Sequence, residues 1–384
     1  MGNATRRRLR LRPLSFGAEP SGERLARIER SPHYDRAAGR FRNPVPAAYR
    51  PRPAGGRSAM LRALLRQYGR RPAGAVPLHR GVPSGPPSSG LRLTWLGHAT
   101  VFAEIDGARV LFDPVWGMRC SPFSFAGPRR LHPAPLPLDR LGPFDAVAVS
   151  HDHYDHLDLP TIRQLAASDA LFAVPLGVGG HLERWGVRTG RIAELDWHES
   201  ADVAGLTLTA APARHFCGRG PRDRQRTLWA SWSVAGPRHR IFHSGDTGYF
   251  PGFADIGAAH GPFDATMIQI GAYSEFWPDV HMTPEEGLRA HRDLGGASAL
   301  LPIHWGTFNL APHPWSEPAE RTLAAAAECG VRTAIPVPGA SFEPSDEILP
   351  ATRWWRELAP DACASPPRGT GDAAGSGPAE PAAP

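Results

Sequence analysis

The run His-Asp-His-Tyr-Asp-His at residues 151–156 restricts the fold and the chemistry of this chain more than any other segment. It holds three histidines and two aspartates and directly follows an apolar stretch, Phe144–Val149. In an extended loop, residues i and i+2 point the same way, so His151 and His153 can reach one ion. Asp155 and His156 lie at the turn into a predicted helix and can face a second ion. Because zinc accepts imidazole nitrogen and carboxylate oxygen, the run predicts a metal-binding loop.

Short apolar runs that end in a polar residue recur between residues 91 and 345. Runs of this length bounded by Gly and Pro are typical of buried strands, and they lie at Leu91–Leu96, Arg109–Phe112, Phe144–Val149, Leu206–Ala211, Arg240–Phe242 and Ala299–Ile303. Helices are predicted at Leu159–Ala167, Pro284–Leu294 and Glu317–Cys329. Strands mixed with helices in this way predict layered sheets covered by helices. We therefore expect the polar residues at the strand ends to share one site at a sheet edge.

The loop alone offers too few ligands for two ions, and three further strand-end residues supply the rest: His215, Asp246 and His304. One zinc ion is assigned to His151, His153 and His215. The other is assigned to Asp155, His156 and His304. Asp246 is expected to bridge the pair, because a carboxylate can offer one oxygen to each ion.

Other polar residues near the strand ends are expected to act outside the ligand set. His98 and Asp113 would support the ligands, with Asp113 holding an imidazole in the tautomer that binds metal. His243 lies three residues before Asp246, on the opposite face of its strand, and is expected to be a packing or surface histidine.

The net charge of +6 is unevenly divided along the chain. Residues 1–90 hold 19 arginines and four acidic residues, so the remainder, which carries the predicted site, is acidic. Since a nucleic-acid enzyme usually places positive charge around its active site, we expect no nucleic-acid partner. The four cysteines show no CxxC spacing and predict neither a disulfide framework nor a zinc ribbon. No apolar run is long enough to span a bilayer, and a cytoplasmic protein is expected.

Composition divides the chain into four parts. Residues 1–57 are rich in Arg and Pro and are predicted to form a disordered leader. Residues 58–90 are predicted to hold a short helix, Ser58–Tyr68, and a linker. Residues 91–345 are expected to form the domain that carries the predicted metal site. Residues 346–384 form a C-terminal segment that is predicted to be disordered from about residue 364.

Several motifs resemble the family of N-acylphosphatidylethanolamine-hydrolysing phospholipases D. They run in order from about residue 91 to about residue 330, and the narrowest are Trp-Leu-Gly-His-Ala-Thr at 95–100, Ser-Trp-Ser-Val at 231–234, Gly-Asp-Thr-Gly-Tyr at 245–249 and His-Trp-Gly-Thr-Phe at 304–308. The resemblance implies an α/β fold, the four-layer αββα sandwich of the metallo-β-lactamase fold. It also implies two zinc ions, held by the seven ligands assigned above.

The resemblance also implies residues that act on the substrate. The family uses a histidine shortly before a Pro-Glu-Glu helix start, and His281 matches it. A capping-box pattern at Thr283–Glu286 independently places His281 in the loop before a helix. Animal members carry a Gln-Tyr pair near the amine head group, where this chain has Ser124 and Phe125. Catalysis is expected from Asp155, which orients the attacking hydroxide, and from His281, which positions the phosphate or protonates the leaving group.

The activity implied is cleavage of a phosphodiester in N-acylphosphatidylethanolamine-like lipids, which gives phosphatidic acid and an N-acylethanolamine. Partners implied are a phospholipid or other phosphodiester substrate, a peripheral membrane contact and a second copy in a homodimer. Two alternatives stay open. One is a lactonase or phosphodiesterase that acts on a small soluble metabolite, and the other is a non-catalytic metal-binding module. A wide apolar groove beside the metals would favour the lipid substrate.

Overall fold

The computed structural model describes residues 13–47, 56–65 and 69–358. Within these residues, one sheet has the strand order β15-β3-β4-β5-β6-β7-β8. Its strands are β3 (Leu91–Gly97), β4 (Thr100–Ile105), β5 (Ala108–Phe112), β6 (Ala146–Ala148), β7 (Leu171–Pro175), β8 (Ile192–Leu195) and β15 (Ser341–Phe342). A second sheet has the order β14-β13-β12-β11-β10-β9. Its strands are β9 (Ser200–Val203), β10 (Leu206–Ala211), β11 (Ser231–Ala235), β12 (Arg240–His243), β13 (Ala265–Gln269) and β14 (Ala299–Ile303).

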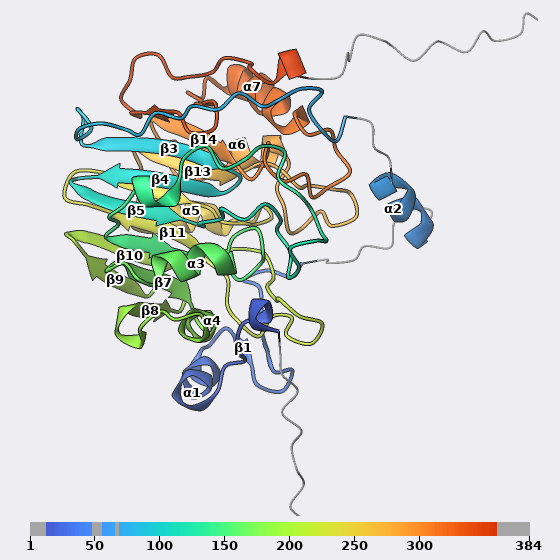
Figure 1. The fold of residues 1–384 in the computed structure, drawn as a ribbon, viewed down its shortest axis with the longest axis vertical. Coiled ribbons are helices and arrows are strands. Elements are labelled where there is room, and N and C mark those ends of the chain that lie inside the picture. Colours follow the sequence, from blue (N-terminus) through green and yellow to red (C-terminus); the bar gives the residue numbers. More distant parts are fainter. Residues whose placement is uncertain (1–12, 48–55, 66–68, 359–384) are drawn as a thin grey trace, which may run out of the picture.

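The alternation of side chains along the strands assigns each residue to one of three apolar layers. Val101 and Ala103 of β4 join a central core that also receives Met267 of β13, so the two sheets pack face to face. Phe102 of β4 points to the opposite face and packs beneath α3 (Leu159–Leu165) and α4 (Gly179–Arg184). Ile268 of β13 likewise faces a third layer under α5 (Gly252–His260), α6 (Pro284–Asp293) and α7 (Glu317–Cys329). The result is the predicted αββα sandwich, with helices outside both sheets (Figure 1).

The six predicted strands are confirmed as β3, β5, β6, β10, β12 and β14. They are divided between the two sheets: β3, β5 and β6 belong to the first sheet, and β10, β12 and β14 to the second. Because the sheets stack face to face, the polar residues after these strands meet at an edge that both sheets share. The predicted helices are confirmed as α3, α6 and α7.

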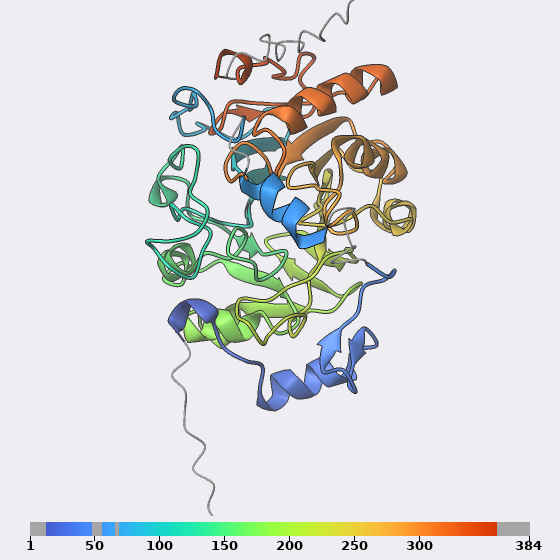
Figure 2. The same cartoon turned by 90° about the vertical axis from the view of Figure 1, so that its right-hand side faces the viewer.

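The expectation of a disordered leader is wrong for residues 13–47. They form a short 3₁₀ turn, Leu14–Phe16, helix α1 (Gly22–Arg30) and a small hairpin of β1 (Tyr34–Asp35) and β2 (Arg40–Phe41). The segment has few apolar residues, but Ile28 and Phe41 are buried in the central core. Figure 2 shows it running along the outside of the domain, next to the strands and helices drawn in green. Anchoring to the domain, rather than a core of its own, explains why composition predicted disorder.

The remaining boundary predictions are partly outside the described residues. Helix α2 (Gly56–Leu65) lies where the helix Ser58–Tyr68 is predicted. The predicted tail from about residue 364 and the first 12 residues fall in undescribed parts of the chain. In the part that the structure describes, no helix combines the length and the apolar character needed to cross a bilayer.

Candidate metal centre

The predicted ligands meet where the two sheets end together. Three residues that directly follow strands have left-handed backbone conformations: His98 after β3 has φ 52°, Asp113 after β5 has φ 40° and His304 after β14 has φ 67°. Non-glycine residues rarely adopt such angles unless the surrounding structure holds them there, and they concentrate at functional sites. All three side chains are buried. The chain therefore turns sharply at these strand ends and directs polar side chains into the interior.

One set of donor atoms comprises His151, His153, His215 and Asp246. His153 Nδ1 lies 2.8 Å from His151 Nε2 and 3.3 Å from His215 Nε2. Asp246 Oδ2 lies 3.9 Å from His151 Nε2 and 3.7 Å from His215 Nε2. These are the residues predicted for the first zinc ion, together with the predicted bridge.

A second set of donor atoms lies on the other side of the Asp246 carboxylate. His304 Nε2 lies 3.1 Å from Asp246 Oδ1 and 3.2 Å from Asp155 Oδ2. His156 Nε2 lies 3.2 Å from Asp246 Oδ2 and 3.5 Å from Asp155 Oδ2. The structure thus brings all seven predicted ligands together, and the Asp246 carboxylate lies between the two groups, as a bridging ligand would.

These residues fit zinc ions. Four donors at about 2 Å from a tetrahedral ion lie roughly 3.3 Å from one another, which is close to the separations in both sets. In His156 and His215, the ring nitrogen that faces away from the site is hydrogen-bonded, as is usual for histidines that bind a metal ion. His156 Nδ1 bonds to Asp113 Oδ2 at 2.7 Å, and His215 Nδ1 bonds to the carbonyl oxygen of Val280 at 2.9 Å. Both contacts leave Nε2 directed into the site, and His156 Nε2 has no hydrogen-bond partner among the described residues.

The electrostatics of the site also favour cations. Burial lowers the pKa of His151 and His215 well below the usual range, so these imidazoles are neutral donors. Burial alone would raise the pKa of Asp246, but His156 and His304 outweigh it and hold this pKa well below the usual carboxyl range. The carboxylate is therefore anionic and buried, a state that requires compensating positive charge.

Of the residues predicted to act around the ligands, Asp113 lies outside the donor groups. It accepts from the backbone N–H of Ser150 at 2.6 Å, in addition to its bond with His156. His98 Nε2 instead lies within the second group of donor atoms, 2.9 Å from Asp155 Oδ2, so its supporting role stays a prediction. His243 is buried, stacks on Phe112 and bonds through Nε2 to the carbonyl oxygen of Ala99, which confirms its packing role.

His281 lies at the exposed side of the site. Its Nε2 is 3.2 Å from Asp246 Oδ2, and its ring centroid is 5.1 Å from that of His215. The side chain keeps 14% of its surface exposed, whereas His304 is fully buried. The predicted capping box at the start of α6 is confirmed, with Thr283 and Glu286 bonding to each other's backbone N–H. This cap fixes the loop that carries His281.

The predicted substrate residues lie on the loop after β5. Ser124 helps to line a cavity of about 340 Å³, together with Met118, Phe123, Leu159 and Tyr154 of the metal-binding loop. Phe125 is 80% exposed, and its ring stacks near that of Phe123 at 5.5 Å. Two other loop aromatics pack locally: Trp315 is buried, and Trp116 Nε1 donates to the carbonyl oxygen of Leu136.

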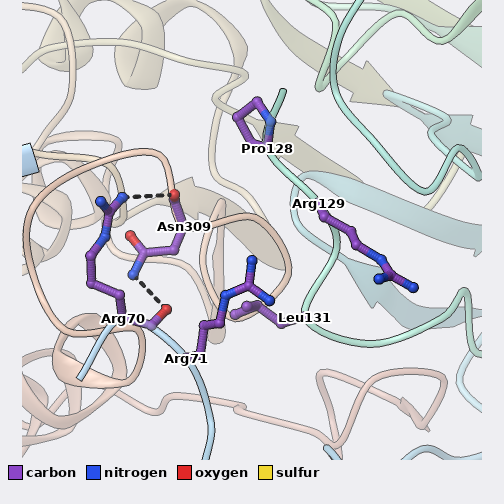
Figure 3. A pocket seen from close by; sticks show the side chains of 6 residues that line it. All are labelled: Arg70, Arg71, Pro128, Arg129, Leu131 and Asn309. Atoms are coloured by element: carbon purple, nitrogen blue, oxygen red, sulfur yellow. Dashed lines mark hydrogen bonds between the residues drawn. The ribbon is translucent and has the colours of Figure 1, made fainter. Parts of the chain in front are cut away.

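A second cavity, of about 200 Å³, lies beside the segment that follows His304 and is lined by Arg70, Arg71, Arg129 and Asn309. Arg70 donates to the carbonyl oxygen of Asn309 at 3.3 Å. Figure 3 shows the guanidinium groups of Arg70 and Arg129 directed to opposite sides. The arginines therefore do not converge on one point, unlike the donors of the metal centre.

Sequence reasoning missed the residues that hold the ligands from outside. Asn43 forms two hydrogen bonds with the backbone of His215, and His181 bonds to Asp152 within the metal-binding loop. Buried Arg219 donates to the carbonyl oxygens of Asp152 and Leu157 at 2.6 and 2.8 Å. None of them belongs to a recognisable motif, and Asn43 lies in the segment whose composition predicted disorder.

Comparison with known proteins agrees with this geometry. Residues 108–305 match the family model described as the beta-lactamase superfamily domain. The chain is 48% identical over 348 residues to an uncharacterised protein of Mycobacterium tuberculosis, which covers 90% of this chain and 92% of that protein. It is 40% identical over 234 residues to the N-acyl-phosphatidylethanolamine-hydrolyzing phospholipase D 1 of Caenorhabditis elegans, over 58% of this chain and 65% of that protein. These relatives share the sequence of the domain that carries the site.

Solved structures resemble the fold at low sequence identity. Igni18, a metallo hydrolase from Ignicoccus hospitalis, is similar with a TM-score of 0.51 and 20% identity, over 66% of this chain and 98% of that chain. Identity at this level supports the arrangement of sheets and helices alone.

Replacing Asp113 should weaken metal binding without unfolding the domain. Asp113→Asn removes the anionic acceptor for His156 Nδ1, and loss of such a partner typically costs 10- to 100-fold in metal affinity. Zinc affinity should be measured by competition with a chromogenic chelator. Asp145→Asn is the matched control, because Asp145 accepts from the backbone of Arg109 just before β6, away from the predicted ligands. Equal zinc affinity in Asp113→Asn and the wild type would contradict the supporting role of Asp113.

Proposed function

This chain belongs to the metallo-β-lactamase superfamily and is related to its N-acylphosphatidylethanolamine-hydrolysing phospholipases D, and we propose that it hydrolyses a phosphodiester bond in lipids of that type. The products would be phosphatidic acid and an N-acylethanolamine. The observation that carries this proposal is the position of a 340 Å³ cavity, lined in part by Met118, Phe123 and Leu159, beside the metal-binding loop. A small soluble substrate would not need such a lining, whereas an acyl chain would.

The proposed cofactor is a pair of zinc ions. The first would be held by His151, His153 and His215, the second by Asp155, His156 and His304, with Asp246 shared. Zinc ions bound there would supply positive charge to the phosphate and would acidify a water molecule. Burial lowers the pKa of His151, His153 and His215, so these imidazoles are neutral donors. Burial would also lower the pKa of His156 and His304, but Asp246 outweighs it and raises both, that of His304 to about 9. Zinc binding would therefore displace protons from these two ligands.

Two residues of the chain are proposed to act on the reacting groups. Asp155 Oδ2 lies 2.9 Å from His98 Nε2, a contact that would restrain its carboxylate while it orients the attacking water. The side chain of His281 is partly exposed, and its Nε2 lies 3.2 Å from Asp246 Oδ2, beside the proposed ligands. From this position it would donate to a phosphate oxygen or to the leaving alkoxide.

The loop that bears Ser124 and Phe125 is proposed to contact the membrane surface. Met118, Phe123 and Phe125 expose 44%, 46% and 80% of their surfaces on this loop, close to the cavity. Arg119 and Arg129 belong to the same segment and can attract anionic head groups, at about 1 kcal/mol per basic residue near a charged surface. Substrate lipid could then reach the cavity from the bilayer without leaving it completely.

The reaction can be tested on vesicles that contain N-acylphosphatidylethanolamine. Zinc-loaded protein should release phosphatidic acid, detected by mass spectrometry, and Asp155→Asn should lower the rate by about 100-fold or more, because it disrupts the charge stabilisation of the site. Asp145→Asn should keep the wild-type rate. Absence of product from wild-type protein with both metals bound would contradict the lipid substrate and favour a small soluble ester or phosphodiester.

The role of His281 can be separated from metal binding. His281→Ala should lower kcat by about 100-fold, as expected for loss of a general acid, while zinc content measured by atomic emission stays unchanged. His260→Ala, at the end of α5, serves as a control that should change neither quantity. Release of zinc from His281→Ala would show instead that His281 is a ligand.

Membrane contact predicts a substrate-dependent effect of Phe125. Phe125→Ser should lower binding to sedimented anionic vesicles by roughly 10- to 100-fold, since burial of one Phe side chain contributes about 1.5–3 kcal/mol. Its rate on a dispersed short-chain substrate should not change. Ile348→Ser is matched, because Ile348 is 86% exposed but lies outside this loop. If both variants bind vesicles as the wild type does, the loop is not the contact.

A further inference from the structure

We infer that Asn43 and His181 are positioning residues for the metal centre, through which the N-terminal segment of residues 13–47 holds His215 and the 151–156 loop in place. This inference rests on the proposed metal centre but not on the proposed lipid substrate. It assigns a role to a segment that carries none of the predicted ligands.

Asn43 binds the backbone of His215 on both sides. Its Oδ1 accepts from the His215 N–H at 2.9 Å, and its Nδ2 donates to the His215 carbonyl oxygen at 2.9 Å. The imidazole of His215 is separately fixed by the bond from Nδ1 to Val280. The backbone and the ring of His215 are thus held by different segments. Together these contacts direct Nε2 towards the other donors of the metal centre.

Contacts on either side of Asn43 fix the position of its backbone. The N–H of Phe41 donates to the carbonyl oxygen of Gln225 at 2.8 Å, and Arg214 Nε donates to the carbonyl oxygen of Pro46 at 3.1 Å. Phe41 is also buried in the central core. The stretch 41–46 is therefore attached before and after Asn43, so the side chain reaches His215 without having to order a free loop.

His181 connects an earlier part of the segment to the metal-binding loop. The backbone N–H of Ala18 donates to His181 Nδ1 at 2.9 Å, so Nδ1 carries no proton, and Nε2–H can donate to Asp152 Oδ2 at 3.2 Å. Asp152 stands between His151 and His153, and its other oxygen accepts from the Gly218 N–H at 2.7 Å. The bond from Ala18 thus selects the tautomer that restrains the loop.

The segment approaches His181 very closely at Gly17. A Cβ atom built on Gly17, which has φ 65°, would lie 2.0 Å from His181 Nδ1. The neighbouring Ser15 carbonyl oxygen accepts from Arg219 Nε at 2.9 Å, and the same guanidinium binds the carbonyl oxygens of Asp152 and Leu157. Three bonds of one buried arginine therefore join the segment to both ends of the loop.

Zinc affinity of the full-length chain tests the inference directly. Asn43→Ala removes both bonds to His215 and should weaken zinc binding by about 10- to 100-fold, the usual effect of losing a partner that orients a ligand. Arg27→Ala is the matched control. It breaks the exposed 2.6 Å ion pair with Glu199, which attaches the same segment to the domain away from the ligands, and it should leave zinc affinity unchanged. Both variants are compared by chelator competition and by thermal unfolding of the metal-free protein.

Further variants keep the test decisive if Asn43→Ala does not fold. Asn43→Asp keeps the acceptor for the His215 N–H but places an oxygen against the His215 carbonyl oxygen, so zinc affinity should fall in this variant as well. His181→Gln should weaken zinc binding through the loop instead. Wild-type zinc affinity in a folded Asn43→Ala, or in both Asn43→Asp and His181→Gln, would overturn the inference, as would an equal loss in Arg27→Ala. Failure of the wild-type protein to bind zinc would contradict the proposed centre itself.

Discussion

The buried carboxylate of Asp246 is the interaction on which the rest of the site depends. Its two oxygens lie 3.1–3.2 Å from His156, His281 and His304, which come from three different segments of the chain. Only 4% of this residue is exposed, so its charge has to be balanced by protein groups or by bound cations. The strand ends, the capped α6 and the loop after β6 each deliver one of the groups that balance it.

Much of this arrangement follows from local sequence patterns. The HxHxDH loop and the apolar runs before His215, Asp246 and His304 are sufficient to predict which residues meet at the site, because a buried strand that ends in a metal-type residue is a short-range signal. The capping box that follows His281 is equally local. The division of the six strands between two sheets is not local, since a single strand gives no sign of the sheet it joins. It depends on which strands pair, such as β5 with β6 and β13 with β14.

The prediction failed for the N-terminal segment for a different physical reason. Composition measures whether a segment can bury enough apolar surface by itself, and residues 13–47 cannot. They are ordered by hydrogen bonds to the domain, such as those of Asn43 and Ala18, and by two well-buried apolar residues, Ile28 and Phe41. Those partners lie more than 130 residues away in the chain, so no window of sequence contains both sides of the contact.

The predicted ligands follow strands of two stacked sheets, and this arrangement has a consequence for the stability of the folded protein. Metal ions bound by residues of both sheets would link the sheets, because the sheets could not separate without releasing the ions. Ligands that bind only the folded state stabilise it by RT ln(1 + [L]/Kd), or about 4 kcal/mol at a thousand times Kd. Loss of metal would therefore abolish activity and also weaken the packing of the two sheets against each other. Chelation would then shorten the lifetime of the protein as well as its activity.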